Sequence, residues 1–180
     1  MKPAFPLDGR AVSRPFLTAL ALAIAFAPLG CNRKAGAPHL LSIVQMGDAQ
    51  AQAQAQLVSG FYPIEAGAWR WTKQNFSVLL APPSGAAQKG AWLRVRVTAP
   101  EALIAKMGTV TLAASVNGQQ LPPETYSAAG TYTYERDAPA NLLQGASVKV
   151  DFALDKVMPP AGPELRDLGI VVLSAGLDPK

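Results

Sequence analysis

The stretch that decides the fold class is residues 148–154, which read VKVDFAL. Apolar residues occupy every second position, and Lys149 and Asp151 stand between them. Successive side chains of a β-strand point to opposite faces of its sheet, so this pattern is typical of a strand with one buried and one solvated face. The region therefore predicts a half-buried sheet.

The same period of two recurs along most of the chain. It is found in residues 76–80, 93–97, 110–116 and 131–134, and residues 168–177 are continuously apolar. Pro and Gly residues separate these segments, and Asn117-Gly118 predicts a hairpin because both positions of such a turn need φ > 0. Only residues 101–107 (EALIAKM) have a helical pattern within this region. Short strands with regular breaks predict an all-β fold, a single antiparallel β-sandwich of jelly-roll or immunoglobulin-like kind over residues 57–180.

Residues 1–30 have the pattern of an export signal. Lys2, Arg10 and Arg14 precede an uncharged apolar run over residues 16–27. This run is shorter than the about 20 residues that a membrane-spanning helix needs. It matches the apolar region of a secretory signal peptide, which is about 7–15 residues long.

The motif Pro28-Leu29-Gly30-Cys31 resembles the lipobox of bacterial lipoproteins, in which Gly or Ala precedes the modified cysteine. The resemblance implies that Cys31, the only cysteine of the chain, carries a lipid that anchors the protein to a membrane of the cell envelope. Asn32 follows it rather than Asp, and by the same resemblance this favours the outer over the inner membrane. A plain secretory signal that happens to contain a cysteine remains the alternative.

Residues 31–56 are interpreted as a tether between anchor and domain. They include four Ala-Gln repeats over residues 49–56, and such low complexity does not build a core. The repeats favour a short helix, since both residues form helices readily. Residues 39–46 are apolar enough to pack on the domain or on the membrane, and the sequence leaves both possibilities open.

Charge and cysteine content exclude several classes of protein. The chain has 16 Lys and Arg against 12 Asp and Glu, a net charge of +4 without a long basic cluster, so no nucleic-acid partner is expected. A single cysteine allows no internal disulfide, so packing alone must hold the domain.

The densest group of candidate site residues lies in residues 60–72, GFYPIEAGAWRWT, and a second lies in residues 164–169, ELRDLG. Trp69 and Trp71 are two positions apart and share one side of an extended segment. The candidate aromatic platform is Tyr62, Trp69 and Trp71. The candidate ion pair or ligand site is Glu65, Arg70, Arg166 and Asp167. Two interpretations stay open: Glu65 pairs with Arg166 or Arg70 to tie the chain ends together, or these groups bind sugar hydroxyls while a Trp stacks on the ring.

The order of these motifs resembles an uncharacterised β-sandwich domain of the bacterial envelope, which is also appended to glycosyltransferases of surface-polysaccharide pathways. Glu164 stands where that pattern commonly has Asp. The matching residues are Gly60, Tyr62, Glu65, Arg70, Trp71, Thr72, Asn117, Gly118, Arg166, Leu168 and Gly169. The resemblance implies a sandwich fold and a partner among cell-surface polysaccharides or their assembly machinery.

The sequence contains few candidates for catalytic residues. His39 is the only histidine and lies in the predicted tether, which excludes His-based triads and most zinc sites. No glycine-rich phosphate loop follows a strand. We therefore expect no catalytic residue, no metal and no cofactor, and a non-catalytic, lipid-anchored binding module of the envelope. The alternatives are a structural or protein-interaction lipoprotein that uses an exposed strand edge and, less favoured, an enzyme acting on glycans.

Overall fold

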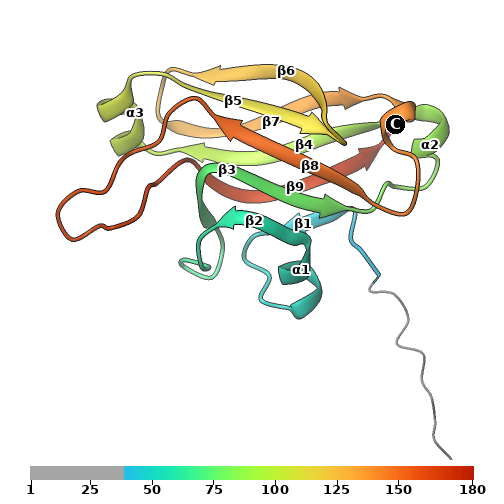
Figure 1. Cartoon of the computed structure of the whole chain (residues 1–180), viewed down its shortest axis with the longest axis horizontal. Coiled ribbons are helices and arrows are strands. Elements are labelled where there is room, and N and C mark those ends of the chain that lie inside the picture. Colours follow the sequence, from blue (N-terminus) through green and yellow to red (C-terminus); the bar gives the residue numbers. More distant parts are fainter. Residues whose placement is uncertain (1–38) are drawn as a thin grey trace, which may run out of the picture. The chain divides into compact units, whose positions relative to one another are not determined.

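Nine β-strands pair in antiparallel fashion within residues 39–180, the part of the chain that the computed structural model describes (Figure 1). The strands are β1 (Ile43–Gln45), β2 (Leu57–Phe61), β3 (Arg70–Leu80), β4 (Ala91–Ala99), β5 (Val110–Val116), β6 (Gln119–Tyr126), β7 (Gly130–Ala138), β8 (Val148–Leu154) and β9 (Val171–Pro179). The predicted all-β sandwich is confirmed. The predicted signal peptide and Cys31 lie outside the described residues.

The strands form two sheets that share β3. One sheet has the order β1-β9-β4-β7 and the other β2-β3-β8-β5-β6. The start of β3, at Arg70 and Trp71, pairs with β9, whereas its later part from Asn75 to Leu80 pairs with β8. Because β3 passes from one sheet to the other, one side of the sandwich is closed by continuous backbone pairing.

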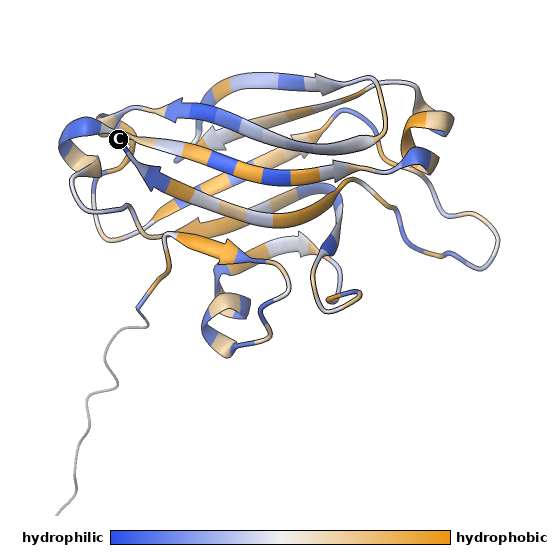
Figure 2. Cartoon of the chain, turned by 180° about the vertical axis from the view of Figure 1, so that it is seen from behind, coloured by the Kyte–Doolittle hydropathy of each residue, from blue (hydrophilic) through white to orange (hydrophobic). Residues whose placement is uncertain are grey.

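The apolar side of each strand faces the space between the sheets. In β4, Leu93, Val95 and Val97 are fully buried, and Arg94 and Arg96 between them are exposed, as the alternation predicts. Figure 2 shows the same alternation of hydrophobic and hydrophilic positions along the strands. The rings of Phe76 and Phe152 stack at the centre of the second sheet, with centroids 4.8 Å apart.

Side chains rather than backbone pairs connect the other two edges of the sandwich, β6 and β7. Pro122 and Pro123 lie in β6, and proline cannot donate a backbone hydrogen bond to a neighbouring strand. The Arg136 guanidinium donates to the carbonyl oxygens of Pro122 and Pro123, at 2.7 and 2.8 Å, and the Tyr134 hydroxyl also donates to Pro122. Burial raises the pKa of Tyr134 to about 12, which keeps this donor protonated.

The short elements follow the local sequence. Helix α3 (Glu101–Met107) has the predicted bounds and buries Leu103 against the core. Helix α2 (Ala86–Lys89) and the 3-10 helix η1 (Ala140–Leu142) lie near each other at the other end of the sandwich (Figure 1). Asn117 and Gly118 form the predicted turn between β5 and β6, with φ of 48° and 87°. Among the described residues, no helix has the length and apolar character needed to cross a bilayer.

The prediction that residues up to 56 form a tether is wrong for the described part of that segment. Strand β1 pairs with β9, and the side chains of Val44 and Met46 are fully buried in the core. The Ala-Gln repeats form helix α1 (Ala51–Gln56), which ends in a fully buried Gln56. The domain therefore begins before residue 57, and the apolar patch of residues 39–46 packs on the sandwich.

Gln56 explains why a polar repeat can belong to a core. Its side-chain carbonyl accepts from the Leu41 N–H at 2.8 Å, and its amide donates to the carbonyls of Leu41 and Leu79 at 2.9 and 2.7 Å. A buried amide is tolerated when its donors and acceptors are satisfied in this way. Composition alone does not reveal such a role, because it depends on backbone groups that the fold brings to the side chain.

Candidate ligand-binding cleft

A cleft runs over one end of the sandwich and consists of two adjoining hollows of about 370 and 280 Å³. Trp71 and Pro100 line both of them. The larger hollow is completed by Ala102, Lys106, Met158, Pro159, Ala161, Glu164, Arg166 and Leu168. The smaller one is completed by Trp69, Thr98, Val171 and Leu173. The walls are mainly apolar, and the charged groups come from Lys106, Glu164 and Arg166.

Helix α3 supplies one wall because of its own periodicity. Pro100 follows the end of β4 and immediately precedes the helix, and its fixed φ of −70° suits that position. Residues four apart lie on the same face of a helix. Leu103 accordingly points into the core, whereas Ala102 and Lys106 line the cleft.

The loop between β8 and β9 supplies the opposite wall and projects from the sandwich (Figure 1). It folds back on itself, because Met158 and Leu168 exchange backbone hydrogen bonds of 2.8 and 2.9 Å, and Ala161 and Glu164 form a second bridge nearer the tip. Leu165 is 82% exposed on this loop. The loop is thus a strand-like flap with an apolar side chain free at its end.

A backbone seam joins the flap to the tryptophan segment. The Gly169 N–H donates to the Thr72 carbonyl at 2.7 Å, and the Thr72 hydroxyl donates to the Ile170 carbonyl at 3.1 Å. A Cβ at Gly169 would lie 2.6 Å from the Thr72 hydroxyl oxygen, so the close approach requires glycine. Two motifs that are almost a hundred residues apart in the sequence therefore lie side by side.

The two tryptophans meet at an angle rather than forming one flat platform. Their ring centroids are 6.2 Å apart and their planes are inclined by 79°. Both rings are partly exposed, so neither is a core residue. A flat ligand that stacks on one ring is bounded by the other, and this inner corner is the most distinctive feature of the cleft.

Arg166 holds the charged rim in place. Its guanidinium donates to Glu65 at 2.8 Å, and to the two carboxylate oxygens of Glu164 at 2.9 and 2.8 Å. About a third of each of these side chains is exposed. The structure thus brings Glu65 to Arg166, which is one of the two pairings considered from the sequence.

The hydrogen bonds from Arg166 also fix the protonation state of the rim. They lower the pKa of Glu164 to about 2 and raise the pKa of Arg166 above its ordinary value. Glycoside hydrolysis needs a carboxylic acid with a raised pKa to protonate the leaving group. Glu164 has the opposite shift, so it is suited to accepting hydrogen bonds and not to donating a proton.

Tyr62 lies outside the cleft walls and supports Arg166 instead. The guanidinium carbon lies 5.0 Å from the centroid of the Tyr62 ring, within cation–π range. Burial and the charge of Asp167 raise the pKa of the Tyr62 hydroxyl. Asp167 itself is exposed and forms no ion pair within the described residues. Neither Tyr62 nor Asp167 lines the cleft.

Arg70 does not join this network. Its side chain is buried and donates to the Met46 carbonyl at 3.1 Å, the Tyr62 carbonyl at 3.0 Å and the Gln54 side-chain carbonyl at 2.7 Å. Burial lowers its pKa. The alternative pairing of Arg70 with Glu65 is therefore wrong, because the fold directs this guanidinium inward, where two of its three acceptors belong to the segment predicted to be a tether.

Several cleft residues were not predicted from the sequence. Pro100, Ala102, Lys106 and Met158 carry no chemistry that marks a site, and they become neighbours only through the fold. A partial signal exists in the proline-rich stretch 159–163, which interrupts the strand pattern immediately before the ELRDLG motif. A long interruption of that kind in a chain of short turns often marks a functional loop.

Comparisons with known proteins identify no family for the chain. No protein-family model matches the chain, and no curated protein matches it. Among solved structures, the chain is similar to the CBM36-1 domain of a multidomain xylanase from the hindgut metagenome of Trinervitermes trinervoides. It is 13% identical over 74% of this chain and 94% of that domain, with a TM-score of 0.38.

Proposed function

We propose that the chain is a non-catalytic carbohydrate-binding module whose ligand lies in the cleft across Trp71. The observation that carries this proposal is the corner of Trp69 and Trp71 beside the Arg166–glutamate network, in one continuous and mainly apolar cleft. Such a site offers an aromatic face to the C–H side of a sugar ring and polar atoms to its hydroxyls.

Hydrogen-bond capacity at the rim supports the proposal. A guanidinium has five N–H donors, and within the described residues Arg166 uses three of them on Glu65 and Glu164. The remaining donors and the carboxylate oxygens can serve sugar hydroxyls, which both donate and accept. Lys106 and Arg166 balance the charges of Glu65 and Glu164, so the rim favours a neutral sugar over an acidic one.

The proposal includes attachment to a membrane of the cell envelope through a lipid on Cys31. The support is the Gly30-Cys31 motif at the end of an apolar run in a chain without another cysteine. Two or more acyl chains anchor a protein firmly, at about 0.8 kcal/mol per buried methylene. Replacing Cys31 by Ser should release the protein from the membrane fraction. Unchanged fractionation and processing would refute the anchor.

The two competing functions have weaker support. A protein partner at a strand edge needs free backbone groups, and at the β6 edge the side chains of β7 already occupy the Pro122 and Pro123 carbonyls. A glycan-active enzyme would need a proton donor in the cleft, and Arg166 keeps the pKa of Glu164 near 2.

The decisive experiment compares two tryptophans. Trp71→Ala removes the residue shared by both hollows, and Trp92→Ala removes a partly exposed tryptophan that lies beside Lys180 and lines neither. Binding of cellohexaose, xylohexaose, mannohexaose and chitohexaose to the full chain is measured by calorimetry. We expect Trp71→Ala to bind about tenfold more weakly, because it loses one aromatic contact of about 1.5 kcal/mol. Trp92→Ala should bind as the wild type does. Equal affinity of both variants for every sugar that binds the wild type would place the ligand elsewhere.

A further inference from the structure

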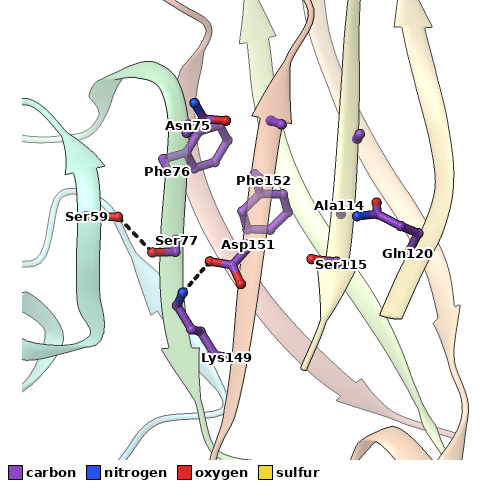
Figure 3. Close-up of a pocket in the computed structure, with 12 residues that line it drawn as sticks. Ser59, Asn75, Phe76, Ser77, Ala114, Ser115, Gln120, Lys149, Asp151 and Phe152 are labelled. Atoms are coloured by element: carbon purple, nitrogen blue, oxygen red, sulfur yellow. Dashed lines mark hydrogen bonds and ion pairs between the residues drawn. The ribbon is translucent and has the colours of Figure 1, made fainter. Parts of the chain in front are cut away.

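A line of polar side chains crosses the outer face of the second sheet. Its members are paired by register across five neighbouring strands: Ser59 of β2 opposite Ser77 of β3, Ser77 opposite Asp151 of β8, Asp151 opposite Ser115 of β5, and Ser115 opposite Gln120 of β6. Figure 3 shows these five side chains between the strands that carry them. Sheet strands lie about 4.8 Å apart, so the line offers a polar group at each such step.

These side chains line a hollow of about 260 Å³. Small residues form its floor, because Ser77 and Ser115 are 3% and 7% exposed and Ala113 and Ala153 lie alongside them. Longer side chains, those of Asn75, Gln120 and Lys149, also line the hollow. A solvated sheet face ordinarily carries long charged side chains throughout. The central short residues make this face a trough instead.

The polar groups of the trough are set for a ligand that both donates and accepts hydrogen bonds. The Ser59 and Ser77 hydroxyls are 2.9 Å apart, and the Lys149 ammonium is 2.7 Å from the Asp151 carboxylate. The ion pair leaves the trough without net charge. The row contains hydroxyl, carboxylate and amide groups, which complement a chain of sugar hydroxyls and offer nothing specific to an anion.

We propose that this trough is a second binding site for a neutral glycan, with the sugar chain running across the strands along the row from Ser59 to Gln120. The ligand class rests on the proposed function, but the site does not, since the trough and the Trp71 cleft share no lining residue. A module with two such sites holds one long polysaccharide at two places, and linking two weak contacts raises the overall affinity without any new contact.

The test fills the trough in the full chain. Ala153→Trp places a large ring on its floor at an exposed position of β8, and Asp151→Ala removes the central carboxylate while breaking only a surface ion pair. Ala87→Trp, on the exposed side of helix α2 and outside both sites, is the matched control. Each variant is titrated with the same four hexasaccharides, and the side-chain amide signals of Gln120 and Asn75 are followed by NMR.

We expect Gln120 and Asn75 to shift on sugar addition in the wild type, in Ala87→Trp and in Trp71→Ala, and to stay unmoved in Ala153→Trp. Asp151→Ala should weaken this response at least about fivefold, equivalent to about 1 kcal/mol. Wild-type affinity in both trough variants, with binding lost in Trp71→Ala, would overturn the second site and keep the proposed function. Binding lost in the trough variants but kept in Trp71→Ala would support the trough as a binding site and overturn the proposed site at Trp71. A wild type that binds none of the four sugars overturns both.

Discussion

Arg70 and Arg166 were both predicted to belong to one candidate site, but they have different roles in the folded chain. Arg70 is buried at 6% exposure and bonds only to neutral oxygens, whereas Arg166 is a third exposed and bonds to two carboxylates. A guanidinium has enough directional donors to fasten three backbone or amide oxygens at once. Arg70 therefore fixes the N-terminal segment to the sandwich, and Arg166 shapes a surface. The same residue type serves architecture or recognition according to which acceptors the fold supplies.

The largest expected effect comes from removing the segment that Arg70 fastens. A chain starting at residue 57 lacks the buried Val44 and Met46 and two of the three Arg70 acceptors. Each lost apolar side chain costs about 1.5–3 kcal/mol of a total stability of about 5–15 kcal/mol, so we expect no cooperative melt. A chain starting at residue 39 should melt cooperatively. Equal thermal melts of both chains, measured by circular dichroism, would show that residues 39–56 are a tether and not part of the domain.

Replacing Arg70 by Met should have the next largest effect. It leaves the Met46 and Tyr62 carbonyls and the Gln54 side chain without their donor, at a cost of about 3 kcal/mol in the free energy of unfolding. Arg70→Lys keeps the charge but not the three-way geometry, and should recover only part of this loss. Urea denaturation measures both. If Lys restores full stability, charge rather than directional bonding fastens the segment.

The Glu65–Arg166 pair should contribute much less, because water screens a pair that is a third exposed. A double-mutant cycle with Glu65→Gln and Arg166→Met should give a coupling of about 1 kcal/mol. The matched cycle on Arg94 and Glu135, whose side chains are 44% and 43% exposed, should give less. Purely additive losses at Glu65 and Arg166 would show that their contact carries no energy.

The smallest expected effect is the pH dependence of the contact between Glu164 and Arg166. Its folded pKa of about 2 lies below the ordinary 4.5, so its contact with Arg166 stabilises the flap fully above pH 4.5 and is lost as the pH falls towards 2. The carboxyl carbon of Glu164, followed by NMR, should titrate near pH 2 in the wild type. In Arg166→Met the midpoint should rise towards 4.5 but stay below it, because the backbone N–H of residue 166 still donates to Glu164. A midpoint near 4.5 in both would mean that Arg166 does not hold this carboxylate.

The sequence predicted the features that depend on local periodicity. Strands β4, β5 and β8, helix α3 and the Asn117-Gly118 turn all follow from alternation, helical spacing or turn chemistry. It also identified two of the segments that line the cleft, residues 60–72 and 164–169, because aromatic and charged residues concentrate in them, but it missed the wall formed by Pro100 and helix α3. It failed where a polar residue finds its partners through the fold. Gln56 and Arg70 are buried for this reason, and their neighbours in sequence carry no sign of it.

The direction of β3 has a consequence for how a tethered cleft is presented. Leu41 lies beside Ala81, just past the end of β3, while Trp71 lies at its start. Ten residues of strand span about 33 Å, so the chain reaches the domain at the pole opposite the tryptophans. The proposed anchor at Cys31 is ten residues before Leu41, a reach of at most about 35 Å. In the proposed lipoprotein, the anchored chain would therefore enter the domain at the end opposite Trp71, and the anchor would leave the cleft uncovered.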